Sequence, residues 1–351
     1  MSPKISFLYV FFTLNICFQN PAWSQTPLAR ANRILAIAVN ETENITYDQA
    51  LESVSATGLT AVSLPYSWED LERRPGVYAP EPNFLAIANV YYVGTGLRLS
   101  LGVNPIDTNK IRLPSDLKGK AWDDPLVIDR YKRLLDYVFL QITSLELTSL
   151  TIGNEIDASL STPEDWAAYT RFFKEVADYA RSFWPGLAVG TKGMMSGMTG
   201  PSRQEFQRIN RYADVVMVTY YPLKEDFTVQ PLAHLQTEFA KLVELYPDKP
   251  IYVMEIGCPS GEGLGSSERQ QADFISAVFT MWDRYADHVQ YVEFTWLHDQ
   301  PEDQRDVWSQ YYGIQDPHFR EFLGTLGLRD NTGRNKAGFA RLLTETQARG
   351  W

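Results

Sequence analysis

The chain has 351 residues, of which 44% are hydrophobic and 21% are charged, the profile of a globular protein with a large apolar core. This length allows one large α/β barrel or two domains of ordinary size. The formal net charge of -11, with no basic stripe along the chain, argues against nucleic acid as a partner.

The first 24 residues have the layout of a secretory signal peptide. Lys4 precedes an apolar run over residues 5–14, and Ala22-Trp23-Ser24 follows with small residues flanking a large one. The apolar run is too short to span a bilayer, although a buried N-terminal strand is an alternative. We therefore expect residues 1–24 to be removed, leaving residues 25–351 as a secreted or periplasmic protein free of the membrane.

Cleavage at that position leaves Cys258 as the only cysteine of the mature chain, so no intrachain disulfide can form. We expect Cys258 to be a buried, small apolar residue rather than a reactive thiol. Asn40 and Asn44 each begin an Asn-x-Thr glycosylation pattern, whose use depends on the host.

Eight short apolar runs recur along the rest of the chain, each typical of a strand buried on both faces. Their starts are 26 to 50 residues apart, which leaves room for a crossover helix each time. The runs are 34–39, 60–65, 97–103, 147–153, 187–192, 214–221, 250–257 and 290–296.

Helical patterns occupy the gaps between these runs. One begins with Thr162 as N-cap and Pro163 in the first turn, and it ends before Pro185-Gly186. Two others cover residues 266–288 and 336–347. Alternation of eight strands with helices predicts a single-domain (β/α)8 TIM barrel. A doubly wound open sheet is the alternative, but no Gly-rich phosphate loop follows the first run.

In (β/α)8 barrels the functional residues lie at the C-terminal ends of the strands. The ends of the predicted strands hold two glutamates, several aromatic residues and few cations, a composition typical of a sugar-binding site. The residues are Asn40, Glu41, Tyr66, Trp68, Asn104, Asp107, Asn154, Glu155, Thr191, Lys192, Tyr220, Tyr221, Glu255, Trp296, His298 and Asp299.

The two glutamates end runs that stand far apart in the predicted barrel. Glu155 ends the fourth run and Glu255 the seventh, so their side chains can face each other across the mouth. Glycoside hydrolysis needs two carboxyl groups that flank the scissile bond, about 5 Å apart for retention and about 6.5–9.5 Å apart for inversion. A helix cap or a solvated loop is the alternative for Glu155 taken alone.

Neighbouring residues supply the other groups that such a site needs. The Asn154 amide is expected to donate to a sugar 2-hydroxyl, and Trp296 offers a flat face for a pyranose ring. Tyr220 or Tyr221 is expected to donate to Glu255. Only one of the pair can point inward from a regular strand, and Tyr221 is slightly favoured.

Asn154-Glu155 and Glu255, within "GNEID", "TYYP" and "MEIG", resemble the retaining (β/α)8 glycoside hydrolases of the large clan whose acid/base and nucleophile end strands four and seven. Among them the endo-β-1,4-galactanases look most similar, with cellulase- and mannanase-like members close behind. The resemblance covers about residues 33 to 348. It implies that Glu155 is the general acid/base, Glu255 the nucleophile and Trp296 the sugar platform, with no cofactor.

Further residues are candidates for substrate contacts. Trp68 lies in "VSLPYSWEDLERRPGVY", which resembles the second-strand segment of the clan. Asn104 and Asp107 are expected to bind sugar hydroxyls, although a turn at Pro105 explains them equally well. His298 is expected either to contact the sugar or to have a structural role. A metal site at His298 and Asp299 is disfavoured because one imidazole makes a poor ligand set.

The segment 297–331 is longer than an ordinary connection and carries Trp308, Tyr311 and Tyr312. Together with Trp122 these residues either line further sugar subsites or pack on the barrel surface. The sequence thus predicts a secreted, monomeric β-glycosidase whose partner is a β-linked glycan. The alternative is a barrel that binds carbohydrate without hydrolysing it.

Overall fold

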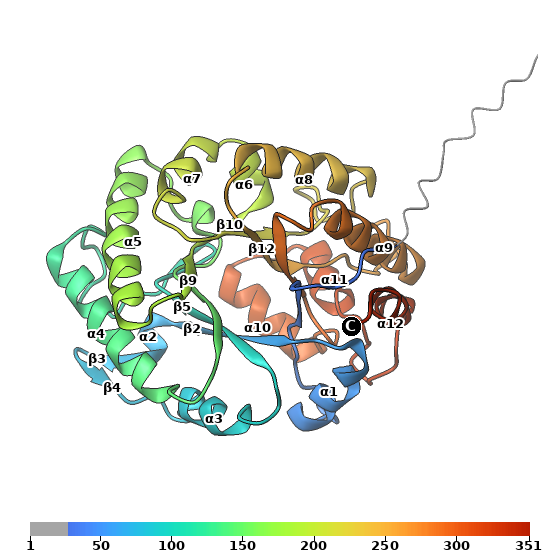
Figure 1. Cartoon of the computed structure of the whole chain (residues 1–351), viewed down its shortest axis with the longest axis horizontal. Helices are drawn as coiled ribbons and strands as arrows, with labels where there is room; N and C mark the ends of the chain where they lie inside the picture. Colours follow the sequence, from blue (N-terminus) through green and yellow to red (C-terminus); the bar gives the residue numbers. More distant parts are fainter. Residues whose placement is uncertain (1–26) are drawn as a thin grey trace, which may run out of the picture.

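The computed structural model describes residues 27–351 as a ring of parallel strands surrounded by helices (Figure 1). The predicted signal peptide, residues 1–24, lies outside the described residues.

Nine parallel strands form the ring, in the order β10-β11-β12-β13-β1-β2-β5-β8-β9. Only Thr191 separates β9 from β10, so these two strands fill one position of an eight-position barrel. The predicted (β/α)8 barrel is confirmed. The strands are β1 Ile34–Ile37, β2 Ala61–Ser67, β5 Arg98–Asn104, β8 Leu147–Thr151, β9 Ala188–Gly190, β10 Lys192–Met194, β11 Val216–Tyr220, β12 Ile251–Ile256 and β13 Val289–Phe294.

Helices follow the strands and cover the outside of the ring (Figure 1). The expected caps are present: the Thr162 side chain accepts from the backbone N–H of Asp165, and Ser267 accepts from that of Gln270. The helices are α1 Tyr47–Val54, α2 Trp68–Leu71, α3 Phe84–Tyr91, α4 Pro125–Gln141, α5 Pro163–Phe183, α6 Met195–Thr199, α7 Arg203–Ile209, α8 Ala233–Leu245, α9 Glu268–Arg284, α10 Glu302–Tyr312, α11 Pro317–Thr325 and α12 Ala337–Arg349.

The strand runs are continuously apolar because both of their faces are buried. In β1, Leu35 and Ile37 belong to the large core between strands and helices, whereas Ile34 and Ala36 belong to a smaller cluster inside the barrel. The interior cluster is a plug of eight buried residues: Ile34, Ala36, Ala61, Val215, Met217, Tyr252, Met254 and Tyr291. Polar side chains occupy the barrel interior beyond this plug, toward the C-terminal ends of the strands.

Three structural features modify the plain barrel. Two short antiparallel hairpins, β3 Glu72–Arg74 with β4 Val77–Tyr78 and β6 Ile106–Asp107 with β7 Lys110–Ile111, follow β2 and β5. Helices α10 and α11 form an insertion after β13 and lie over the middle of the ring in Figure 1. Within residues 27–351, no helix is long and apolar enough to cross a membrane.

Candidate active site

A cavity of about 840 Å³ lies at the C-terminal ends of the barrel strands. Glu155 and Glu255 both line it, as sequence analysis predicted for a pair at strand positions four and seven. Around them the lining is aromatic and hydroxylic, and its polar members include Ser63, Ser100, Asn104, Asp107, Thr108, Arg112, Asn154, Lys192, Tyr221, Glu293 and Thr295.

Glu155 sits at a sharp change of chain direction. Gly153 has φ +89°, and a Cβ there would collide with the Tyr169 hydroxyl, so glycine is required at that turn. Glu155 itself adopts the left-handed region, φ 43° and ψ 52°, directly before a single 3-10 turn, Ile156–Ala158. Its carboxylate makes no capping hydrogen bond to that turn. The capping explanation for Glu155 is therefore wrong.

The carboxylate of Glu155 instead turns toward the cavity, where two hydroxyl groups hold it. The Thr219 hydroxyl donates to Oε1 at 2.7 Å, and the Thr108 hydroxyl donates to Oε2 at 3.0 Å. Burial and the charge of Glu255 raise the pKa of Glu155 to about 7, and the two hydroxyl groups oppose that rise. Glu155 therefore holds a proton in mildly acidic solution, as a general acid requires.

Glu255 on β12 has a different set of partners. The Lys192 ammonium lies 2.8 Å from Oε1, and the Tyr221 hydroxyl donates to Oε2 at 2.8 Å. The ammonium and the phenol thus hold both oxygens of the Glu255 carboxylate in place. Burial lowers the pKa of Lys192, but the charges of Glu255, Glu293 and Glu155 raise it more, so Lys192 stays charged. An ionised carboxylate held at both oxygens is suited to act as an aimed nucleophile.

The two carboxylates are linked through β11. Thr219 is the strand partner of Glu255 in the β11–β12 register, and its hydroxyl binds Glu155. Thr219 therefore connects the two carboxylates, through its backbone pairing on one side and its hydroxyl group on the other. Backbone pairing fixes the relative position of the two groups.

Glu293 is a third buried carboxyl in the cavity lining, and sequence analysis did not single it out. It lies on β13, accepts from the Tyr291 hydroxyl at 2.8 Å and is hydrogen-bonded to the Ser63 hydroxyl. Burial raises the pKa of Glu293 to about 7, with Glu255 adding to the rise and Lys192 opposing it. Glu293 is thus positioned below the reacting pair, where its ionisation affects the local charge.

The Asn154 side chain lies in the cavity wall beside Glu155. Its amide nitrogen donates to Asp107 Oδ1 at 2.9 Å, while its Oδ1 is buried without a hydrogen-bond partner among the described residues. Asn104 lines the same wall, and its Oδ1 also lacks a partner among residues 27–351. Unpaired buried acceptors are costly unless a ligand donor satisfies them. The contacts of both residues with sugar hydroxyls stay predictions. For Asn154 the unpaired group is the acceptor oxygen, whereas the sequence predicted that the amide nitrogen donates.

Trp296 follows β13 and lines the cavity, where it packs with the cluster around Phe319, Phe322 and Leu326. It is partly exposed, so a ring face remains available to a ligand. Tyr221, not Tyr220, is the member of its pair that faces the nucleophile position.

Tyr220 does not line the cavity, which corrects its prediction as a substrate contact. It is 2% exposed and packs outward between Phe239 of α8 and Phe274 of α9. Period-two alternation along β11 explains why it points away when Tyr221 points in.

His298 is also absent from the cavity lining and is fully buried. Its Nδ1 lies 2.8 Å from the Asn40 carbonyl, and the Asn40 amide bonds to the His298 backbone on both sides. His298 joins the ends of β13 and β1 and does not contact a substrate. The same bonds occupy the amide of the Asn40 glycosylation pattern, whereas Asn44 is exposed.

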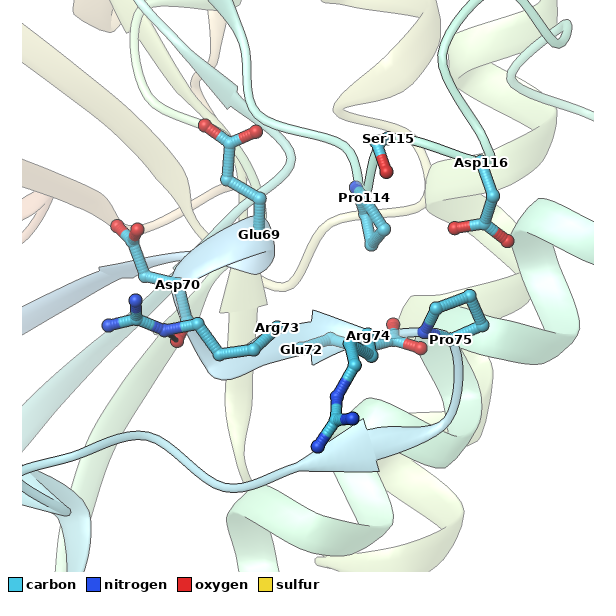
Figure 2. A pocket seen from close by; sticks show the side chains of 9 residues that line it. All are labelled: Glu69, Asp70, Glu72, Arg73, Arg74, Pro75, Pro114, Ser115 and Asp116. Carbon is cyan, nitrogen blue, oxygen red and sulfur yellow. Dashed lines mark hydrogen bonds between the residues drawn. The ribbon is translucent and has the colours of Figure 1, made fainter.

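Trp68 does not line the cavity either, which corrects its prediction as a substrate contact, because its side chain is fully buried. Its Nε1 donates to Glu72 at 2.7 Å, and its ring packs edge-on against Tyr131. Figure 2 shows Glu72 lining a separate surface pocket of about 260 Å³, together with Asp116. Arg130 forms ion pairs with both of those carboxylates.

Aromatic residues of the insertion form much of the remaining cavity wall. Three residues of α10 line the cavity: Trp308, Tyr311 and Tyr312. Of the two alternatives for the long segment, this position agrees with the lining of sugar subsites. Trp122 instead packs against Tyr169 and Phe172 in the core. Adjacent flat rings are typical of surfaces on which sugar rings stack.

Neither a metal centre nor a reactive thiol stands out near the cavity. Within residues 27–351, no group of three or more His, Cys, Asp or Glu side chains is arranged to hold a metal ion. Cys258 is 1% exposed, and burial raises the pKa of its thiol to about 12.

No protein-family model and no curated protein sequence matches the chain. Solved structures do match its fold. A GH5_18 variant from Streptomyces cattleya, bound to Manβ1-4GlcNAc, is 16% identical with a TM-score of 0.69, over 90% of this chain and 80% of that one.

An exo-β-1,4-mannosidase from Opitutaceae bacterium strain TAV5 is 16% identical with a TM-score of 0.68, over 93% of this chain and 62% of that one. Xylanase 10B from Thermotoga maritima is 10% identical with a TM-score of 0.63, over 91% of this chain and 96% of that one. At these identities the likeness establishes a shared single-domain (β/α)8 barrel. What the barrel does must be argued from the cavity.

Proposed function

We propose that the protein is a retaining β-glycosidase that hydrolyses O-glycosidic bonds of a β-linked polysaccharide or oligosaccharide. The observation that carries the proposal is the contrast between two carboxyl groups in one cavity. Glu255 is held by an ammonium and a phenol, and Glu155 by hydroxyls in a site that favours its protonated form. Paired carboxyl groups with opposed protonation states are the requirement for this chemistry.

In the first step the ionised Glu255 attacks the anomeric carbon, and a C–O ester bond forms as the glycosidic C–O bond breaks. The proton of Glu155 moves to the leaving oxygen. In the second step Glu155, now ionised, takes a proton from water, whose oxygen attacks the anomeric carbon. The ester bond breaks, Glu255 regains its charge, and the sugar leaves with its original anomeric configuration. Neither step uses a metal or cofactor.

Other cavity residues have supporting roles in this proposal. Asn154 presents an unpaired Oδ1, and Trp296 and the aromatic residues of α10 offer ring faces for sugar stacking. Lys192 and Tyr221 hold both oxygens of Glu255 and so fix the direction in which its carboxylate points. The acidic net charge is compatible with a neutral glycan substrate.

The identity of the substrate sugar is proposed only at the level of its class. The motifs resemble endo-β-1,4-galactanases, whereas two structural neighbours carry the names mannosidase and xylanase. The common element is a β-linked glycan, and we propose that class. We further propose that residues 1–24 direct secretion and that the mature chain acts as a monomer outside the cytoplasm.

The test is a screen of aryl β-glycosides and β-linked polysaccharides with wild type, Glu155→Ala and Glu255→Ala. Wild type should cleave at least one substrate with retention of the anomeric configuration. NMR of the first-formed anomer measures this. Azide should restore turnover in both variants, giving a β-glycosyl azide with Glu155→Ala and an α-glycosyl azide with Glu255→Ala.

Two results would contradict the proposal. If Glu255→Ala keeps most of the rate, Glu255 is not the nucleophile. If wild type binds glycans but cleaves none, the alternative of a binding barrel without turnover is correct. The intact carboxyl pair argues against that alternative.

A further inference from the structure

The insertion after β13 and the β6–β7 hairpin meet across the mouth of the barrel. We call residues 302–325 of the insertion together with residues 106–112 of the hairpin the mouth wall. The two parts come from strand positions eight and three, which β1 and β2 separate in the ring. A connection between them therefore crosses a sector of the opening instead of following the rim.

On the hairpin side, three contacts join the parts. The Tyr311 hydroxyl donates to Asp107 Oδ2 at 2.6 Å, and the Asn109 side chain donates to the Tyr312 carbonyl at 2.8 Å. The Arg112 guanidinium lies 5.4 Å from the centre of the Tyr311 ring, a cation–π contact. Asp107 also accepts from Asn154, so the wall is attached to the residue next to Glu155.

On the opposite side, α11 is fastened to the loops after β11 and β12. The Glu321 carboxylate accepts from the Gly263 backbone N–H at 2.8 Å, and the Thr325 carbonyl accepts from Ser260. Phe227 packs against Phe319 with ring centroids 5.2 Å apart. The mouth wall is thus tied to loops at strand positions three, six and seven as well as to its own position eight.

The inner face of the wall lines the same cavity as the two glutamates. Trp308, Tyr311 and Tyr312 of α10 and Phe319 and Phe322 of α11 all contribute to that lining. The cavity also reaches down to Ser100 and Glu293, which are 1% and 2% exposed. The reacting groups therefore lie in an aromatic-sided pocket with a polar floor.

An enzyme that cuts inside a long glycan must let the chain leave the site on both sides of the scissile bond. A wall fastened at both ends obstructs one of those paths. We propose that the mouth wall restricts this site to chain ends, so that the protein removes terminal sugars from β-linked oligosaccharides and polysaccharides. This inference rests on the proposed glycosidase function and adds the mode of attack to it.

The test follows the first products released from reduced β-linked oligosaccharides of three to six sugars and from the matching polymer, using the linkage that wild type cleaves best. Chromatography at less than about 5% conversion should show one terminal product of constant size. A mixture of internal fragments would overturn the inference. Absence of all hydrolysis of aryl β-glycosides and of β-linked oligosaccharides and polysaccharides would instead overturn the proposed function, so the two failures are distinguishable.

Variants test whether the wall is responsible. Asn109→Ala combined with Tyr311→Phe removes both side-chain hydrogen bonds between hairpin and α10. The rate on polymer relative to the rate on a trisaccharide should rise by about 3- to 10-fold, with internal fragments among the first products. Gln310→Ala is the matched control, because Gln310 is an exposed residue of α10 outside the cavity lining.

The Gln310→Ala ratio should equal that of wild type. If the double variant keeps the wild-type ratio and product pattern while its far-ultraviolet circular dichroism and melting temperature show a folded protein, the wall does not set the mode of attack. Hydrogen exchange of residues 302–325 provides a second measure. It should be faster in the double variant than in Gln310→Ala, since the fastening contacts are lost.

Discussion

Glu155 and Glu255 line one cavity, but hydroxyl groups hold the first and charges hold the second. Thr108 and Thr219 donate to Glu155 without adding any formal charge. Lys192 places an ammonium on one oxygen of Glu255, and Tyr221 places a phenol on the other. The comparison shows how neighbouring side chains give two carboxyl groups in one cavity different surroundings, as the proposed roles of proton donor and nucleophile require.

The separation also depends on which strands supply the neighbours. The partners of Glu155 come from the loop after β5 and from β11, whereas the partners of Glu255 come from β10 and from the residue after β11. Because parallel strands end at the same edge, polar side chains at or near their ends reach both carboxylates.

The largest expected effect comes from removing the charge beside Glu255. Lys192→Met should lower kcat by about 10²-fold or more, the usual range for loss of one preorganised electrostatic partner. The loss should appear mainly in kcat and much less in KM, since Lys192 holds the Glu255 carboxylate and not the substrate. Lys192→Arg is the control and should recover most of the rate. A wild-type kcat in Lys192→Met would show that Lys192 has a packing role only.

The next effect is the pH dependence of Glu155. With its pKa raised to about 7, Glu155 is a proton donor below that pH and loses the proton above it. The value of kcat/KM should therefore fall about tenfold per pH unit above the pKa of Glu155, which forms the alkaline limb of the pH–rate profile. Glu293→Gln should keep the limb, whereas Glu155→Gln, assayed on an activated aryl glycoside, should lack it. A limb that disappears in Glu293→Gln would assign the titration to Glu293.

Glu293 allows a test through stability. Its pKa is raised above the ordinary value, so the folded state holds a proton that the unfolded state releases, and stability falls as pH rises from about 4.5 to about 7. Glu293→Gln should thus be more stable than wild type at pH 8 by about 1 to 3 kcal/mol and should lose that advantage at pH 4.5. Urea denaturation at both pH values measures the difference. Equal differences at the two values would contradict the buried titration.

The smallest effect concerns the hydroxyls of Glu155. Thr219→Val removes the donor at 2.7 Å, which favours the ionised form of Glu155. The alkaline limb should move up by about half a pH unit, equivalent to a hydrogen bond of about 0.7 kcal/mol. Thr219→Ser keeps a hydroxyl and should leave the limb in place. A downward shift in Thr219→Val would reverse the assigned role of the hydroxyl.

The barrel and the positions of the two glutamates were predictable because both depend on short-range patterns. Continuous apolar runs at regular spacing identify strands buried on both faces, and the residue that ends each run then lies at the mouth. Glu155 and Glu255 needed only that rule, and Tyr221 needed only the alternation along β11. The caps of α5 and α9 likewise depend on neighbours within one turn.

Residues whose roles depend on contacts across the ring were not predictable. Lys192 ends a strand and was noted only for its position, since nothing local indicates a carboxylate from β12 beside it. Glu293 lies within the apolar run of β13, where a carboxylate reads as an interruption of the pattern. Trp68 and His298 also end strands, yet their side chains turn into the core to bind Glu72 and Asn40.

The left-handed backbone at Glu155 carries a further consequence. That conformation suits glycine, and any other residue there costs about 1 to 2 kcal/mol. Replacing Glu155 with glycine would thus be expected to make the fold more robust and the site inert. Selection for robustness alone would favour that exchange. A glutamate kept in this strained conformation therefore costs stability, which the proposed acid/base role of Glu155 would explain.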